Sequence, residues 1–164
     1  MIALLAVAAI GIGLWRLESA SAGLEVERTR VGAVPVTLYR PASPGPSPVV
    51  LIAHGLSGSQ QLMQSFAITL ARNGFLVSVA RDAAHARRIL SGLEFDLIVM
   101  DVMMPGMNGI ELVKALKTVV PDAEVVLMTA FGTVEKAVEA MRAGAYDFVE
   151  KPLKRMQMAK TVRN

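Results

Sequence analysis

Cysteine is absent from the 164 residues of this chain, and histidine occurs only twice, as His54 and His85. The lack of cysteine excludes disulfide bonds, thiolate metal sites and a cysteine nucleophile, and it is compatible with a reducing compartment. Acidic residues are missing between Val31 and Arg81, so no carboxylate can come from that stretch. No carboxylate can therefore come from the predicted strand 49–53 or from the segment that follows it.

Apolar residues make up 53% of the chain and charged residues 19%, which excludes disordered and fibrous classes and suits one domain with a buried core. The net charge of +3 is modest for this length. Several basic residues gather in the last fourteen positions, where we predict a final helix from Leu153 onward. We interpret them as the solvated face of that helix and expect no direct nucleic-acid binding. They are Lys151, Lys154, Arg155, Lys160 and Arg163.

The first 23 residues form a separate apolar segment, in which positions 1–15 carry no charged side chain. As a helix this run would span ~22 Å, short of the ~30 Å hydrocarbon core of a bilayer. Three alternatives stay open: a membrane tether, a cleaved signal with Ala20-Ser21-Ala22 resembling a cleavage site, or a terminal helix with neither role. A tether would favour a cytoplasmic side for the rest of the chain, because Arg16 and two further arginines follow the run.

Residues 24–48 are predicted to form a β-hairpin and a linker. The ranges 24–31 and 34–39 have strand character and flank Gly32-Ala33, a pattern typical of a hairpin. The range 41–48 is rich in proline, serine and glycine and predicts no regular structure.

Residues 49–164 alternate between strand and helix patterns, which predicts an α/β fold with a parallel sheet covered by helices on both faces. Uninterrupted apolar runs mark buried strands, and apolar residues at helical spacing mark the helices. The helix after Thr133 is expected to carry an apolar face. The predicted strands are 49–53, 75–80, 97–100, 125–128 and 146–149; the helices follow Ser59, Asp82 (83–93), Gly109 and Thr133, the last with Val134, Ala137, Val138 and Met141 on one face.

Three polar residues follow buried strands directly: Asp101, Thr129 and Lys151. The carboxyl ends of parallel strands meet at one edge of the sheet, so we expect these side chains to converge there. A carboxylate, a hydroxyl and an ammonium group together can accept and hold a phosphoryl group. Asp101 would be the nucleophile, while Thr129 and Lys151 would bind the phosphoryl oxygens.

At these residues the chain resembles the response-regulator receiver family. The resemblance covers about 74–164 and rests on the segment 96–109 around Asp101, on Met128-Thr129-Ala130, on 144–148 and on Lys151-Pro152. It implies a flavodoxin-like, doubly wound sheet with strand order 2-1-3-4-5. It also implies that Asp101 is the phospho-acceptor, with Thr129 and Lys151 as its partners. Phe148 would be an aromatic switch. The Asp101 carboxylate and the Met103 backbone carbonyl would be ligands of Mg²⁺.

The first strand of the series departs from the receiver pattern. Receivers end this strand in an acidic pair that binds Mg²⁺, whereas this chain has His54 and Gly55 there. Mg²⁺ prefers oxygen ligands, and one carboxylate with one carbonyl is a thin ligand set. Weak Mg²⁺ binding and impaired phosphotransfer are therefore expected.

The range 24–75 resembles a different family, the α/β-hydrolases. The segment 49–58 is similar to the strand and His-Gly loop that forms part of the oxyanion hole in those enzymes. No catalytic triad can be assembled, because Ser59 stands where the nucleophile motif around Ser57 needs glycine, and no histidine follows His85. The chain is thus chimera-like, with a hydrolase-like first β–α unit and a hairpin that extends the sheet beyond the 75–80 strand.

These patterns predict a signalling module of a two-component phosphorelay rather than an enzyme, with self-phosphorylation at Asp101 as its one reaction. The alternatives are an inactive esterase fragment of the α/β-hydrolase type and a receiver-like scaffold without phosphotransfer. Expected partners are a histidine kinase or phosphotransfer protein and an output domain or partner protein on another chain. The expected location is the cytoplasm, with an inner-membrane tether through residues 1–15 as an option.

Overall fold

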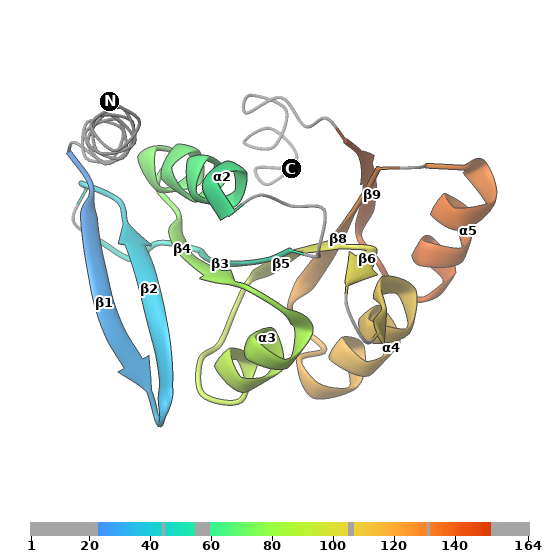
Figure 1. Cartoon of the computed structure of the whole chain (residues 1–164), viewed down its shortest axis with the longest axis horizontal. Helices are drawn as coiled ribbons and strands as arrows, with labels where there is room; N and C mark the ends of the chain where they lie inside the picture. Colours follow the sequence, from blue (N-terminus) through green and yellow to red (C-terminus); the bar gives the residue numbers. More distant parts are fainter. Residues whose placement is uncertain (1–22, 44, 55–59, 105–106, 131, 152–164) are drawn as a thin grey trace, which may run out of the picture.

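The computed structural model describes residues 23–43, 45–54, 60–104, 107–130 and 132–151. Strands and helices alternate along this part of the chain after an initial hairpin (Figure 1). The elements are β1 (Glu25–Val31), β2 (Val34–Arg40), β3 (Val49–Ala53), α2 (Gln60–Arg72), β4 (Leu76–Ala80), α3 (Ala83–Leu90), β5 (Leu97–Asp101), β6 (Met103–Met104), β7 (Met107–Asn108), α4 (Gly109–Val119), β8 (Glu124–Thr129), α5 (Val134–Arg142) and β9 (Asp147–Glu150).

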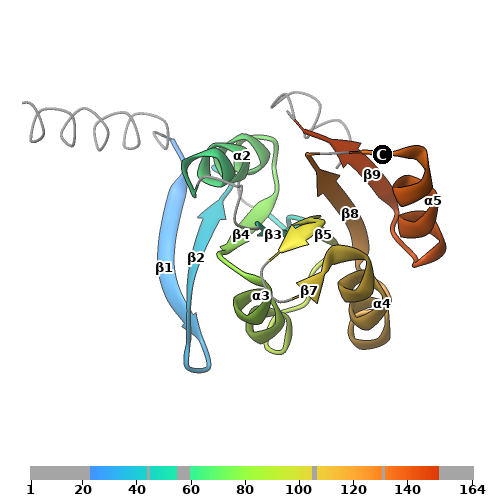
Figure 2. The ribbon, with the colours of Figure 1, turned by 45° about the vertical axis from the view of Figure 1, so that its right-hand side comes forward.

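The main sheet has seven strands in the order β1-β2-β4-β3-β5-β8-β9. The last five of these are parallel and give the predicted order 2-1-3-4-5, with β3 as the first strand of the series. The hairpin β1–β2 joins the outer edge of β4 in antiparallel fashion, as expected (Figure 2). The flavodoxin-like fold and the added hairpin are both confirmed.

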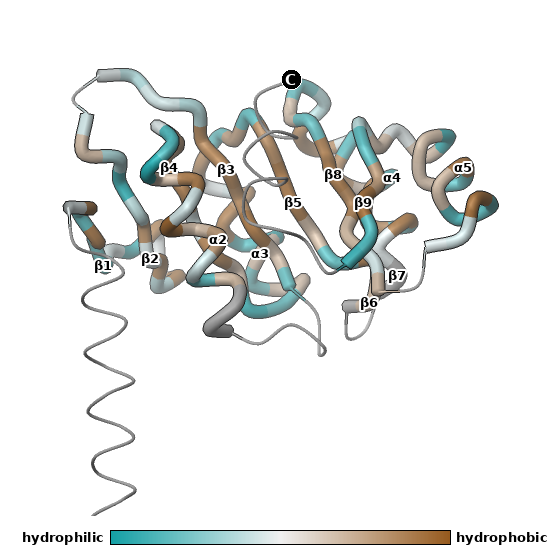
Figure 3. The backbone as a smooth tube through the Cα atoms, turned by 90° about the horizontal axis from the view of Figure 1, so that it is seen from above, coloured by the Kyte–Doolittle hydropathy of each residue, from teal (hydrophilic) through white to brown (hydrophobic). Residues whose placement is uncertain are grey.

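Helices cover both faces of the sheet. One face packs against α2, where Phe66 and Leu70 are fully buried, and the other face packs against α3, α4 and α5. The hydropathy view shows the central strands as largely apolar (Figure 3). Ile110, Val113 and Leu116 are buried on α4, as their 3.6-residue spacing predicts.

Helix α3 is shorter than the sequence pattern predicts. Asp82 caps its start by accepting the backbone N–H of His85 at 2.6 Å, as expected. The helix ends at Leu90 instead of continuing to Leu93. A Cβ on Gly92 would lie 2.3 Å from a methyl carbon of Val31, the last residue of β1. The segment just after the helix is therefore in close contact with the hairpin.

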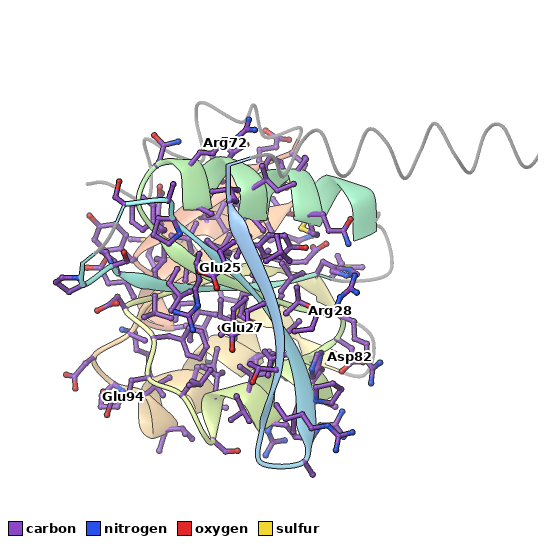
Figure 4. The ribbon with its side chains drawn as sticks, turned by 90° about the vertical axis from the view of Figure 1, so that its left-hand side faces the viewer. Glu25, Glu27, Arg28, Arg72, Asp82 and Glu94 are labelled. Atoms are coloured by element: carbon purple, nitrogen blue, oxygen red, sulfur yellow. The ribbon has the colours of Figure 1, made fainter. Side chains whose placement is uncertain are left out.

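The hairpin is attached to the parallel sheet by backbone pairing and by one histidine. Leu38 and Tyr39 pair with β4, and an ion pair of 2.7 Å between Arg40 and Glu27 joins the two strands of the hairpin. His85 of α3 is buried and places its Nε2 3.1 Å from the carbonyl oxygen of Pro35. Its Nδ1 accepts the N–H of Arg81 at 3.4 Å, so Nε2 is the nitrogen that donates to the hairpin. Figure 4 looks onto this side of the molecule, with β1 in front.

We expect His85→Leu to lower the free energy of unfolding by about 1–3 kcal/mol. The substitution keeps an apolar body in the packing but leaves the Pro35 carbonyl and the Arg81 N–H without this partner. Urea unfolding measures the change, with Ala84→Leu on the exposed face of α3 as the control. Equal stability of the two variants would show that the His85–Pro35 contact does not hold the hairpin.

Several predictions concern residues outside the described part of the chain. They are the predictions for residues 1–22 of the apolar segment, for Gly55 and Ser57, and for the final helix from Leu153. Within the part that is described, no helix has the length and apolar character needed to span a bilayer.

Candidate functional site

Asp101 is the last residue of β5 and is almost fully buried, with 1% of its surface exposed. Both of its carboxylate oxygens are engaged. Oδ1 accepts the backbone N–H of Met103 at 3.0 Å, and Oδ2 accepts a hydrogen bond from the Lys151 ammonium at 2.5 Å. The carboxylate is therefore held in one orientation at the carboxyl edge of the sheet, with a cation in direct contact.

Thr129 and Lys151 reach the same edge from the next two strands. Asp101 is in register with Met128 of β8, so Thr129 lies one residue beyond it, and the Thr129 side chain is buried. The backbone N–H of Lys151 donates to the Thr129 carbonyl at 2.7 Å, which fixes the end of β9 beside β8. The structure thus brings together the three residues that were predicted to converge.

Phe148 and Thr129 both border Gly132, in the loop after β8. A Cβ on Gly132 would lie 3.4 Å from the Thr129 methyl group, 3.5 Å from the Phe148 ring and 3.6 Å from the Glu150 carboxyl carbon. Gly132 therefore lies between the hydroxyl-bearing residue and the aromatic ring, and a methyl group there would be in van der Waals contact with both. Sequence analysis did not identify this glycine as part of the site.

The loop after Asp101 is held closely against the start of α4. Residues Met103–Met104 and Met107–Asn108 form a small antiparallel pair, β6–β7, where only a bend was predicted. The N–H of Gly109 donates to the Val102 carbonyl at 2.9 Å, and a Cβ on Gly109 would lie 2.6 Å from the Val102 Cα. Only glycine fits this contact, which positions the acceptor loop.

Helix α5 begins directly beyond this edge, at the predicted N-cap Thr133. The Thr133 hydroxyl accepts the N–H of Lys136 at 3.3 Å. Hydrogen bonds from the backbone N–H of Glu135 and from Thr133 lower the pKa of the Glu135 carboxyl. The predicted apolar face of α5 exists, but it faces outward: Val134, Val138 and Met141 are exposed, and Ala140 is the buried residue of this helix.

His54 follows the end of β3, on the other side of β5. Ala53 is in register with Met100, so His54 lies level with Asp101, and its N–H donates to the Ala80 carbonyl at 3.4 Å. The second residue of the replaced acidic pair, Gly55, is outside the described residues.

The predicted Mg²⁺ ligands are Asp101 and the Met103 backbone carbonyl. In the described ranges, no group of three or more His, Asp or Glu side chains is arranged to hold a metal ion. The two Asp101 carboxylate oxygens accept hydrogen bonds from the Met103 N–H and the Lys151 ammonium.

The comparisons with known proteins agree with this geometry. The sequence model of the family described as "Response regulator receiver domain" matches residues 58–163. Protein PetR of Rhodobacter capsulatus is 49% identical over 105 residues, which are 64% of this chain and 43% of that protein. The transcriptional regulatory protein FixJ of Bradyrhizobium diazoefficiens is 47% identical over 79 residues, or 48% of this chain and 38% of that protein. The chain thus spans less than half the length of these curated relatives.

Solved structures show the same fold. The beryllofluoride-activated receiver domain dimer of NtrC4 is 30% identical, with a TM-score of 0.64, and the match covers 70% of this chain and 93% of that one. The chemotaxis response regulator CheY4 of Vibrio cholerae is 28% identical, with a TM-score of 0.65 and coverage of 72% and 98%. These matches give no support to the hydrolase-like interpretation of residues 24–75 or to a chimeric origin.

Proposed function

The chain belongs to the response regulator receiver domain family, and from this premise we propose that it is a phospho-accepting module in which Asp101 takes up the phosphoryl group. One observation carries the proposal. The buried Asp101 carboxylate lies at the carboxyl edge of the sheet with the Lys151 ammonium 2.5 Å away, and Thr129 ends the neighbouring strand.

In the proposed reaction, a carboxylate oxygen of Asp101 attacks the phosphorus of a phosphohistidine on the donor protein. The P–N bond breaks, its electron pair returns to the imidazole, which takes up a proton, and an acyl phosphate forms on Asp101. Lys151 offsets the charge of the transferred group, because its ammonium already lies against the acceptor oxygen. Water is largely kept from the acceptor, since Asp101 is buried.

The acyl phosphate would act as a switch through Thr129 and Phe148. Phosphorylation adds up to two negative charges at this edge, and the Thr129 hydroxyl can move toward the phosphoryl oxygens. The movement of Thr129 would leave space into which the Phe148 ring could rotate, next to Gly132. The surface of α5 and β9 would change with it, as in other switches in which local charge biases a two-state element.

Receiver domains typically bind Mg²⁺ at the phosphorylation site, and for this chain we propose weak binding because His54 and Gly55 replace the acidic pair. The bound ion would supply positive charge next to the phosphoryl group. If Mg²⁺ binds weakly, the Lys151 ammonium has to supply most of the positive charge next to the phosphoryl group. Slow phosphorylation is the consequence that we expect.

The proposed partners are a histidine kinase or phosphotransfer protein as phospho-donor and an effector that responds to the switch surface. Receivers are not enzymes in the ordinary sense, and self-phosphorylation is the one reaction proposed here. Family membership favours action in the cytoplasm. A membrane tether through residues 1–15 stays a prediction, since those residues lie outside the described part of the chain.

Incubation with ³²P-labelled acetyl phosphate and a panel of histidine kinases tests the proposal. We expect slow labelling of the wild-type chain, complete loss of label in Asp101→Asn, and retention in Asp122→Asn, which changes an exposed carboxylate elsewhere. Label that persists in Asp101→Asn, or a wild-type chain that no donor labels, would contradict the assignment. The second outcome would leave a receiver fold that works through protein contacts alone.

A further inference from the structure

A groove runs between α3 and α4, which lie side by side on one face of the sheet (Figures 1 and 2). Its middle part is a hollow of about 280 Å³ with an almost entirely apolar surface. Leucines of the core form its floor, while Ala115 and Val119 of α4 are exposed at its edge. The hollow is thus an extension of the core that opens to solvent. Its apolar lining consists of Leu90, Leu112, Ala115, Leu116 and Val119.

Two arginines border this hollow on its α3 side. Arg87 lines both the apolar hollow and a second one of about 380 Å³, which is also lined by Ala84 and Arg88. Helix side chains lean toward the N-terminus of their helix, so the two guanidinium groups are directed toward the turn that contains Ala84. Both arginines are exposed, and in the part of the chain that the structure describes neither forms an ion pair. The α3 side of the groove therefore offers positive charge to an anion.

The carboxylates that border the groove lie at its far end, toward the amino edge of the sheet. A third hollow, of about 540 Å³, shares Leu90 and Val119 with the apolar one and is lined by Glu94, Asp96 and Asp122. The groove is therefore positive on its α3 side, apolar in the middle and negative at the far end. The other charged residues of α3, α4 and the Asp82 cap line none of these three hollows: Asp82, Glu111, Lys114 and Lys117.

The apolar hollow has the size of a medium-length hydrocarbon chain. At ~30 Å³ per water molecule it has room for about nine waters, and a methylene group is about as large as a water molecule. Its polar lining consists of Arg87 and Ser91, and the Ser91 hydroxyl already donates to the Arg88 carbonyl at 2.8 Å. Water with few polar partners is displaced favourably by apolar groups. A mostly apolar hollow with a few polar groups at its border is typical of small-molecule sites.

We propose that this groove binds a medium-chain carboxylate of about eight to ten carbons. The carboxylate contacts the guanidinium groups of Arg87 and Arg88, which suit its planar pair of oxygens, and the hydrocarbon chain lies in the apolar hollow. A free carboxylate fits better than an anionic membrane surface, because Glu94 and Asp122 at the far end would repel such a surface. The inference does not rest on phosphoryl transfer, and its test uses the unphosphorylated chain.

Titration of the full ¹⁵N-labelled chain with sodium octanoate, followed by NMR, tests the proposal. We expect saturable shifts confined to α3 and α4 and their adjoining loops, with a Kd on the order of 0.1–1 mM. From butanoate to octanoate, each added methylene should tighten binding about two- to fourfold. The gain should end near decanoate, because the hollow has room for about nine such groups.

Three ligands of the same chain length test the charge pattern of the groove. Octanol and octyltrimethylammonium lack the anionic group and should bind at least about tenfold more weakly than octanoate. Octanedioate should bind at least about tenfold more weakly as well, because its second carboxylate would enter the apolar hollow and approach Glu94 and Asp122.

Arg87→Gln/Arg88→Gln removes the positive charge of the groove and should weaken octanoate binding at least about tenfold, to the level of octanol. Arg28→Gln/Arg30→Gln makes the same charge change on β1, away from the groove, and should bind octanoate as the wild type does.

Ala115→Phe places a ring at the edge of the hollow and should abolish binding of octanoate and octanol alike. Thr118→Phe adds the same ring on the exposed side of α4, outside the hollow, and should leave binding unchanged. Circular dichroism checks that each variant is folded.

Equal binding of octanoate and octyltrimethylammonium would show adsorption to an apolar surface alone and would overturn the proposal. So would octanoate binding that a folded Ala115→Phe variant retains, or the absence of saturable shifts at concentrations below micelle formation. Resonances of α3 and α4 that shift with the concentration of the free protein would indicate that a second copy occupies the groove, and would overturn it as well.

Discussion

Phosphorylation of Asp101 should become strongly dependent on Mg²⁺ when His54 and Gly55 are both replaced by aspartate. His54 follows the end of β3 and lies level with Asp101, so carboxylates at positions 54 and 55 would supply the oxygen ligands that the acidic pair supplies in other receivers. A bound Mg²⁺ then adds positive charge where the phosphoryl group arrives, beside Lys151. We expect the rate of labelling by acetyl phosphate to rise on the order of tenfold or more at millimolar Mg²⁺.

The control for this experiment is the triple variant that also carries Asp101→Asn, which should bind the metal less well and take up no label. Titration with Mg²⁺ in the presence of beryllofluoride, followed by NMR, separates metal binding from phosphotransfer. If the double aspartate variant binds Mg²⁺ but gains no phosphorylation, then the acceptor is impaired for a reason other than the missing acidic pair.

Lys151→Met is expected to lower the free energy of unfolding by about 3–5 kcal/mol. Asp101 is 1% exposed at its side chain and Lys151 is 16% exposed, so removal of the ammonium leaves a buried carboxylate without its charge partner. The Met103 N–H still donates to Oδ1, but it cannot neutralise the charge. Urea unfolding at neutral pH measures the loss.

A double-mutant cycle distinguishes this cause from lost packing. Asp101→Asn removes the charge, so the combination Asp101→Asn/Lys151→Met should recover much of the stability that Lys151→Met alone loses. If the double variant is as unstable as the sum of the single variants, then the lysine stabilises the fold through its aliphatic stem and not through Asp101.

The topology of the sheet was predictable because its signal is distributed over many residues. Strands β3, β5 and β8 each contain an uninterrupted apolar run, and the polar residue that follows the run marks the carboxyl end. The end of α3 was not predictable from the same pattern. Leu93 continues the apolar spacing, whereas the close approach of Gly92 to Val31, about sixty residues away in sequence, is seen only in the structure.

The convergence of Asp101, Thr129 and Lys151 was also predictable, because parallel strands bring their carboxyl ends to one edge. The roles of Gly109 and Gly132 were not, since a glycine that permits a close approach looks like any turn glycine until its neighbours are known. Periodicity likewise predicted the apolar stripe of α5 but not its direction. The 3.6-residue spacing shows that apolar residues share a face, and it does not show whether the sheet or solvent lies opposite.

The hairpin changes which strand the sheet presents to other molecules. Without it, β4 (LVSVA) would be an outer strand with unpaired backbone groups and almost no charge, a pattern typical of aggregation-prone segments. In the described structure, the outer strand on that side is β1 (EVERTRV), in which acidic and basic side chains follow one another. Charged edge strands resist uncontrolled pairing with other chains. The hairpin thereby protects an apolar sheet from edge-to-edge association.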